Sequence, residues 1–162
     1  MGSPPSFRPP TTFRSSFGPK LYTLSFLGRP EDFRTLISSN PIFGSLRELR
    51  VELTRIGSLL QIEASRAILI DLLLPFINNL APQLLSLKLW SRAPLDLSTF
   101  FFQLAPFPCL KALNVRTTFN TAFGDASGLK RLICDSSDTL QRVDLHLNPA
   151  GSMGGPFIRE TA

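Results

Sequence analysis

A pattern of the form Leu-x-x-Leu-x-Leu recurs along the chain, with Phe or Val replacing some of its leucines. The five matches are Leu21-Tyr-Thr-Leu24-Ser-Phe26, Leu46-Arg-Glu-Leu49-Arg-Val51, Leu84-Leu-Ser-Leu87-Lys-Leu89, Leu110-Lys-Ala-Leu113-Asn-Val115 and Leu140-Gln-Arg-Val143-Asp-Leu145. Their starts are 25, 38, 26 and 30 residues apart. A sixth, weaker match begins at Leu129, only 11 residues before the last one, so we interpret it as part of a helix.

Each match predicts a short β-strand. Alternate residues of a strand point to opposite faces, so the last two apolar residues of a match share one face. No single unit can bury that face, so neighbouring units must stack, and we expect Leu87 and Leu113 to line one continuous core. In the fuller leucine-rich-repeat consensus, Asn or Cys stands three residues after the last leucine. In this chain that position holds Arg29, Thr54, Arg92, Thr118 and Asn148, so the match is good in the strand and poor in the turn.

The segments between the predicted strands carry signals typical of helices. Pro30, followed by two acidic residues, predicts a helix that ends before Asn40-Pro41. Apolar residues at steps of three and four predict a helix over residues 63–80, with a break or kink at Pro75. Two shorter helices are expected over Thr99 to Ala105, capped by Ser98, and over Gly128 to Asp135, capped by Asp125 or Ser127.

These elements predict an α/β fold, specifically a leucine-rich-repeat-like solenoid of about five short parallel strands that alternate with helices. We expect this domain to span residues 20–148. Residues 1–19 are expected to form a disordered tail rich in Pro and Ser, and residues 149–162 a flexible Gly-rich tail. The start Met1-Gly2 with Ser6 also fits a myristoylation pattern, and a mitochondrial transit peptide is a further alternative for the N-terminal segment.

The charge of the 162-residue chain is concentrated at its N-terminus. The chain has 17 basic and 12 acidic residues, which give a net charge of +5. Residues 1–30 contain four basic and no acidic residues, so residues 31–162 are nearly neutral. The longest apolar run, Ala67 to Ile77, is interrupted by Asp71 and Pro75, so we expect no transmembrane helix.

Four stretches carry a resemblance to a known family. They are Leu73-Leu-Pro-Phe-Ile-Asn-Asn-Leu-Ala-Pro-Gln-Leu-Leu-Ser-Leu-Lys-Leu89, Leu95-Asp-Leu-Ser-Thr-Phe-Phe-Phe102, Phe107-Pro-Cys-Leu-Lys-Ala-Leu-Asn-Val115 and Ser127-Gly-Leu-Lys-Arg-Leu-Ile-Cys-Asp-Ser-Ser-Asp-Thr-Leu-Gln-Arg-Val-Asp-Leu145. In this order and spacing, over roughly residues 40–148, the chain resembles the leucine-rich-repeat region of basidiomycete fungal F-box-type proteins. The resemblance implies a solenoid that recruits substrates to a cullin-type ubiquitin ligase. The F-box itself, the helical segment that docks the ligase adaptor in that family, is not found in this sequence.

The residue types needed for catalysis are sparse. His146 is the only histidine, and we expect it to face solvent or a partner from the last predicted strand. Cys109 and Cys134 lack Cys-x-x-Cys spacing, and we expect both to be small buried apolar residues. The sequence contains no phosphate-binding glycine motif placed between a strand and a helix. We therefore predict no catalytic residue, no cofactor and no metal site.

The concave face of the predicted sheet is the best candidate for a binding surface. Its candidate residues lie between the apolar positions of the strands and are Arg50, Lys88, Trp90, Asn114, Arg116, Arg142, Asp144 and His146. Trp and Arg are the residues most enriched at binding hot spots, so Trp90, Arg50 and Arg116 are the strongest of the set. The alternative interpretation is a solvated sheet face with Trp90 packed under a loop.

The sequence therefore predicts a protein–protein interaction module that is not an enzyme. We expect a protein partner, no membrane association and a cytoplasmic or nuclear location; a ligase adaptor is expected as a partner only if an F-box is supplied elsewhere. Two alternatives remain open. In the first, the chain is a nucleic-acid-binding protein that uses its basic N-terminal tail; the nearly neutral charge of residues 31–162 argues against this alternative. In the second, the chain is a truncated repeat fragment without independent function.

Overall fold

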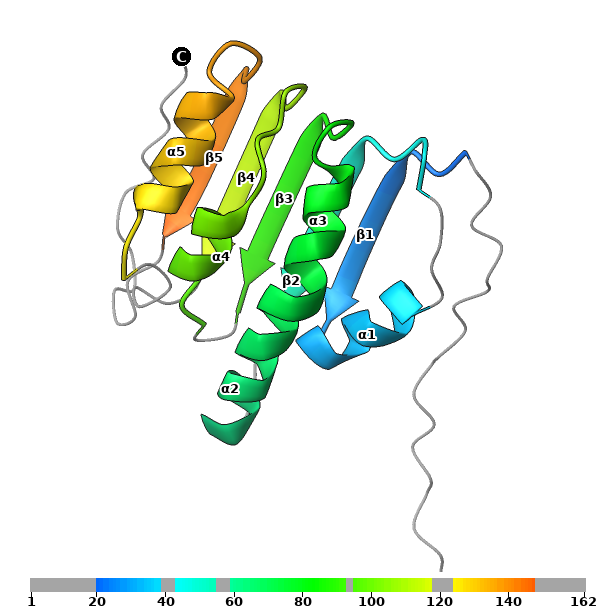
Figure 1. Ribbon diagram of the computed structural model, residues 1–162, viewed down its shortest axis with the longest axis vertical. Helices are drawn as coiled ribbons and strands as arrows, with labels where there is room; N and C mark the ends of the chain where they lie inside the picture. Colours follow the sequence, from blue (N-terminus) through cyan, green and yellow to red (C-terminus); the bar gives the residue numbers. More distant parts are fainter. Residues whose placement is uncertain (1–19, 39–42, 55–58, 93–94, 118–123, 148–162) are drawn as a thin grey trace, which may run out of the picture.

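Five parallel strands form one sheet in which the order in space follows the order in the chain (Figure 1). The structure is a computed structural model, and it describes residues 20–38, 43–54, 59–92, 95–117 and 124–147. The strands are β1 (Thr23–Gly28), β2 (Glu48–Leu53), β3 (Ser86–Ser91), β4 (Ala112–Thr117) and β5 (Arg142–Leu147). All five predicted strands, and their parallel arrangement, are therefore confirmed. The two predicted tails, residues 1–19 and 149–162, lie outside the described residues, as do Thr118 and Asn148.

The Leu-x-x-Leu-x-Leu units align with one another across the sheet. Leu49 of β2 is paired with Leu24 of β1 on one side and with Leu87 of β3 on the other, and Leu113 of β4 follows Leu87. The same main-chain hydrogen-bond pattern recurs where each pair of neighbouring strands begins. There, one carbonyl oxygen that precedes a strand accepts hydrogen bonds from two successive N–H groups at the start of the next strand. The accepting carbonyls belong to Tyr22, Arg47, Leu85 and Lys111. The repeat in the sequence thus corresponds to a repeat in the structure.

The helices lie on one side of the sheet (Figure 1). They are α1 (Pro30–Ser38), α2 (Leu59–Ile68), a π-helical turn η1 (Leu69–Leu73), α3 (Leu74–Leu80), α4 (Ser98–Gln103) and α5 (Ser127–Asp135). Their positions agree with the predicted helices to within a few residues at each end, including the helix at the sixth weak match. The first helix was predicted to end before Asn40-Pro41, and these two residues lie outside the described residues.

Of the break or kink predicted at Pro75, the break does not occur: the helix continues through a wide π-helical turn. The Leu74 N–H donates to the carbonyl oxygen of Leu69, five residues back, and Pro75 follows in the first turn of α3. Proline has no N–H, and its ring crowds the carbonyl group four residues earlier in an α-helix. A π-helical turn at this place gives the ring room, so the helix continues to Leu80.

The core lies between the strands and the helices. The leucine and valine residues that alternate along β2, β3 and β4 are at most 1% exposed. From the helix side they meet a large set of apolar residues, which includes Phe33, Leu73, Ile77, Phe100, Phe101 and Leu132. The intervening strand residues point the other way, and no described helix covers them. Parallel sheets are usually covered on both faces, so a parallel sheet with no described helix on one face is unusual.

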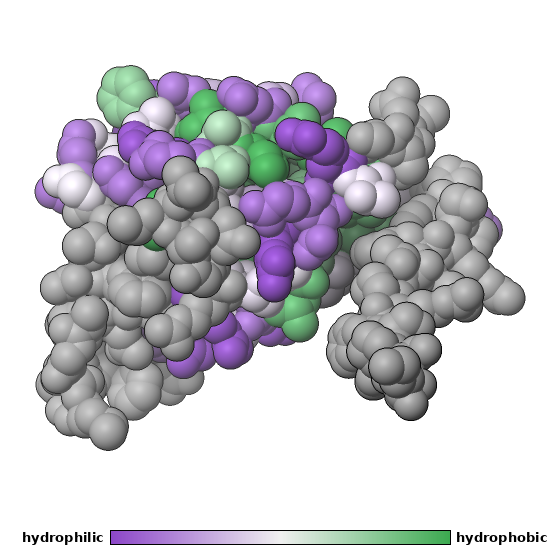
Figure 2. All heavy atoms as spheres, turned by 90° about the horizontal axis from the view of Figure 1, so that it is seen from below, coloured by the Kyte–Doolittle hydropathy of each residue, from purple (hydrophilic) through white to green (hydrophobic). Residues whose placement is uncertain are grey.

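At the end of the molecule where the strands finish, hydrophilic residues make up most of the described surface that is visible. Seen from below, the described atoms are mainly polar, with smaller hydrophobic areas between them (Figure 2). Among the described helices, none is long and apolar enough to cross a membrane.

The caps of α4 and α5 differ from the prediction at one position. Ser98 makes no capping bond of its own to α4; the Asp96 carboxylate accepts from the Ser98 N–H at 2.9 Å and from the Ser98 hydroxyl at 2.6 Å. A carboxylate reaches the first amides of a helix as well as a hydroxyl does, and it carries a charge that the helix dipole favours. At α5, Asp125 is the capping residue, because its carboxylate accepts from the N–H and the hydroxyl of Ser127.

The Asp96 cap predicts a pH dependence of stability. Burial raises the pKa of Asp96, but the hydrogen bonds from the hydroxyl and N–H of Ser98 and from the Gly124 backbone outweigh it, so the pKa is lowered overall. A lowered pKa stabilises the folded state above the unfolded pKa of about 3.9, and this contribution is lost as the pH falls through the folded value. We expect the free energy of unfolding of Asp96→Asn to decrease less between about pH 5 and about pH 3 than that of the unmodified chain.

Urea denaturation at a series of pH values measures this difference. Asp138→Asn is the matched control, because Asp138 is exposed and makes no hydrogen bond among the described residues; it is expected to behave like the unmodified chain. Parallel pH profiles for Asp96→Asn and the unmodified chain would show that ionisation of Asp96 does not contribute to the stability of the folded state.

Candidate functional site

The candidate site is the side of the sheet opposite the helices, which no described helix covers, and we call it the open face. Its residues form rows across the strands because the strands are in register. One row is Arg50–Lys88–Asn114–Asp144, and the next is Glu52–Trp90–Arg116–His146. Neighbouring parallel strands lie about 4.8 Å apart, so members of a row are in contact distance of one another. The eight residues predicted for the site all belong to β2, β3, β4 or β5 and share this face.

Trp90 lies at the centre of the open face between two guanidinium groups. The Arg50 guanidinium carbon is 4.2 Å from the centre of the Trp90 ring, and that of Arg116 is 5.5 Å from it. Both distances fall within the range of cation–π attraction, which contributes about 0.5–1 kcal/mol at exposed sites. The three residues come from three adjacent strands, so the sheet register assembles this cluster.

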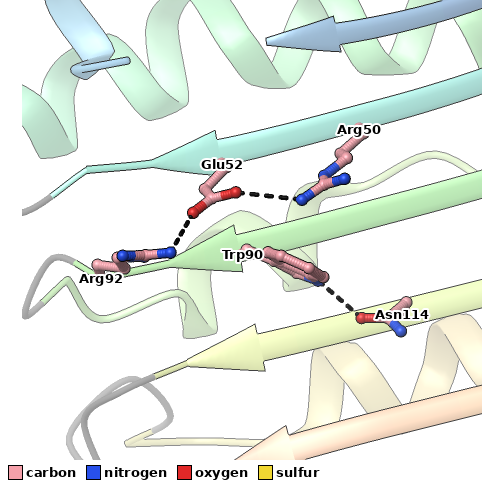
Figure 3. A network of polar contacts seen from close by, with 5 residues as sticks. All are labelled: Arg50, Glu52, Trp90, Arg92 and Asn114. Carbon is pink, nitrogen blue, oxygen red and sulfur yellow. Dashed lines mark hydrogen bonds and ion pairs between the residues drawn. The ribbon is translucent and has the colours of Figure 1, made fainter. Parts of the chain in front are cut away.

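A chain of hydrogen bonds leads from Trp90 across the sheet to β5 (Figure 3 shows its first link). The indole N–H of Trp90 donates to the Asn114 side-chain oxygen at 2.9 Å, and the Asn114 amide donates to the Asp144 carboxylate at 3.3 Å. The Arg142 guanidinium then donates to the same carboxylate oxygen at 2.7 Å. These bonds hold the Trp90 ring in one orientation on the surface.

Glu52 anchors the other side of the cluster (Figure 3). Its side chain is 9% exposed, and its two carboxylate oxygens pair separately with Arg50 at 3.3 Å and with Arg92 at 2.8 Å. A carboxylate this deeply buried needs such partners, because an unpaired buried charge is strongly unfavourable. Glu52 therefore fixes the position of Arg50, which in turn stacks on Trp90.

Two cations of the open face have no acidic partner among the described residues. Lys88 makes no hydrogen bond or ion pair with any of the described residues, and Arg116 touches Trp90 without pairing with a carboxylate of the described part of the chain. Both side chains are exposed. Lys88 lies on β3 two residues before Trp90, and Arg116 lies on β4 beside Trp90 in the same row. The open face thus combines a rigid aromatic centre with unpaired positive charge.

The structure brings most of the predicted site residues into one connected cluster. Arg50, Trp90, Asn114, Arg116, Arg142 and Asp144 are linked by the contacts above, Lys88 lies within the same rows, and His146 is half-buried beside Arg116 in the register. Trp90 is partly exposed and contacts side chains of its own face.

Glu52 and Arg92 were missing from the predicted site. Arg92 continues the alternation of Lys88 and Trp90 by one further step, so the period of two residues was the available signal.

The prediction that the two cysteines are buried is wrong. Cys109 and Cys134 are both exposed and unpaired with each other. Cys109 lies in the turn before β4, and Cys134 on the outer side of the last turn of α5, where the apolar face is supplied by Leu129 and Leu132 instead. Within the described residues, no group of three His, Cys, Asp or Glu side chains is arranged to hold a metal ion.

Comparison with known proteins finds no family model, no curated protein and no solved structure that matches this chain.

Proposed function

We propose that this chain is a protein–protein interaction module whose partner binds on the open face. The observation that carries the proposal is Trp90, which stands between Arg50 and Arg116 on the face of the parallel sheet that no described helix covers. Trp and Arg are enriched at binding hot spots, and here a hydrogen bond already fixes the Trp90 ring, so little of its conformational freedom is left to lose on binding. A partner on this face would complete the two-sided cover that parallel sheets usually have.

The specific form that we propose is a leucine-rich-repeat-like solenoid that recruits protein substrates, as the resemblance to F-box-type proteins implies. It is supported by the strand order, which follows the chain, and by the carbonyl pattern that recurs at Tyr22, Arg47, Leu85 and Lys111. Repeat proteins of this kind bind partners on the exposed faces of their stacked units. Membership of a ubiquitin ligase would require an F-box from elsewhere, and a cytoplasmic or nuclear location is proposed with it.

Site-specific cross-linking in extracts of the source organism tests the proposal. We place the photoreactive residue benzoylphenylalanine at Ser86 on the open face or, as the control, at Lys130, which is exposed on α5. We expect the Ser86 position to form a discrete cross-link to a protein, and the Lys130 position to form none with that protein.

Trp90→Ala in the Ser86-labelled chain should remove the cross-link, because loss of a central hot-spot residue weakens binding by about 2 kcal/mol or more, about 30-fold. A cross-link that is equally strong from Lys130, or that survives Trp90→Ala, would contradict binding on the open face. Cross-links to nucleic acid alone would favour the nucleic-acid alternative.

A further inference from the structure

We propose that the open face selects an acidic segment of its protein partner, and that Lys88 and Arg116 pair with the carboxylates of that segment. This inference rests on the proposed function and specifies the chemistry of the partner. It follows from which charges on the open face are already neutralised and which are not.

Two of the three acidic residues of the open face are paired with arginines within the chain, and the third, Glu48, keeps its charge. Glu52 pairs with both Arg50 and Arg92, and Asp144 pairs with Arg142. The third acid, Glu48, accepts a hydrogen bond from the Thr23 hydroxyl at 3.3 Å. After these pairings, the positive charges left without an acidic partner among the described residues are those of Lys88 and Arg116. The face is therefore complementary to negative charge.

The geometry of Arg116 also suits a carboxylate. Its guanidinium carbon lies 5.5 Å from the centre of the Trp90 ring, and its N–H groups make no hydrogen bond or ion pair with the described residues, so they are available to a partner. A guanidinium whose edge is open can donate two parallel hydrogen bonds to one carboxylate, the strongest common form of this pair. Lys88, on the neighbouring strand and one row away, provides a second donor that any carboxylate nearby can use.

The pattern of charge favours a peptide over a nucleic acid. A nucleic acid presents a phosphate at every nucleotide, and its binding surfaces are strongly basic throughout. On the open face, three carboxylates are interspersed with the cations, so the face is not basic throughout and a regular line of phosphates would find free cations at only some of its positions. Carboxylates spaced along an extended peptide, with an apolar side chain between them for Trp90, fit the available positions.

Selection from a displayed library of random 12-residue peptides tests this inference on the full chain. We expect peptides selected on the unmodified protein to be enriched in Asp and Glu over the starting library, and their affinity to fall at least about tenfold in Lys88→Glu/Arg116→Glu. The charge-matched control, Lys20→Glu/Lys130→Glu, changes two exposed lysines outside the strands and should bind the same peptides as before. Selection on Lys88→Glu/Arg116→Glu should instead enrich Lys and Arg.

The outcomes separate this inference from the proposed function. Selected peptides that depend on Trp90 but show no acidic enrichment, and no loss on charge reversal, would overturn the acidic partner and leave the interaction face intact. A selection in which no peptide depends on Trp90 would overturn both proposals. Binding of a 12-nucleotide oligouridine that is stronger than any peptide and lost in Lys88→Glu/Arg116→Glu would overturn both in favour of a nucleic acid.

Discussion

Gly128→Ala is expected to lower the free energy of unfolding by about 2 kcal/mol or more, because residue 128 touches the backbone of another helix. A Cβ atom at this position would overlap with the backbone nitrogen of Phe102 and would lie 2.7 Å from the carbonyl carbon of Phe101. Backbone atoms cannot rotate away as a side chain does, so α4 and α5 would have to separate. The better helix propensity of alanine offsets at most about 1 kcal/mol of this loss.

The separation would spread into the core, since Phe100 and Phe101 of α4 are fully buried. It would also strain the hydrogen bonds that join the two helices, such as that from the Arg131 guanidinium to the Leu104 carbonyl oxygen at 2.8 Å. Urea denaturation gives the change in unfolding free energy. Gly44→Ala is the control, because an added Cβ there meets nothing within 4 Å, and its stability should stay the same or rise by up to about 1 kcal/mol. Equal stabilities for the two variants would contradict the close approach of α4 and α5.

Leu87→Ala is expected to cost about 2–5 kcal/mol, the usual range for removing a buried leucine side chain from a packed core. Leu87 is 1% exposed in the central strand, and its neighbours in the register, Leu49 and Leu113, are equally buried. A cavity at this place would be surrounded by rigid strands on both sides and by helices above, so it could close only in part. A loss of this size is a large share of the total stability of a domain.

The adjacent residue supplies the control for this prediction. Lys88→Ala changes an exposed side chain on the opposite face of the same strand, and we expect its effect on stability to stay within about 0.5 kcal/mol. Chemical denaturation of both variants gives the comparison. A cost below about 1 kcal/mol for Leu87→Ala, or a larger cost for Lys88→Ala, would mean that the two faces of β3 are assigned the wrong way round.

The strands and their faces could be predicted because a strand has a period of two residues and one buried side. At β3, the alternation of Ser86, Leu87, Lys88, Leu89 and Trp90 leaves one choice of face that buries leucine, and the same choice aligns Trp90 with Arg116. The proximity of Trp90 to Arg50 and Arg116 then follows from stacking the units in sequence order. This part of the candidate site needed no information beyond the spacing of leucines.

Other features depend on contacts that a periodic pattern does not encode. The two cysteines were assigned to the interior from their residue type, but at Cys134 the position on the helix decides, and that position faces outward. The cap of α4 was assigned to Ser98 because Ser is a common capping residue, whereas the nearby carboxylate of Asp96 is the stronger acceptor. The burial of Glu52 is accompanied by two arginines that converge on it, Arg50 from the same strand and Arg92 from just after β3, which requires the geometry of both side chains.

The sequential order of the strands has a consequence for how the chain folds. Each strand pairs only with the strands before and after it in the sequence, so closing each pair requires a loop of 25 to 38 residues and never the full length of the domain. The entropic cost of closing such loops differs little from one pair to the next, because it grows only with the logarithm of loop length. Folding can therefore begin at any adjacent pair of strands and spread outward, with each completed unit serving as the surface on which the next one forms.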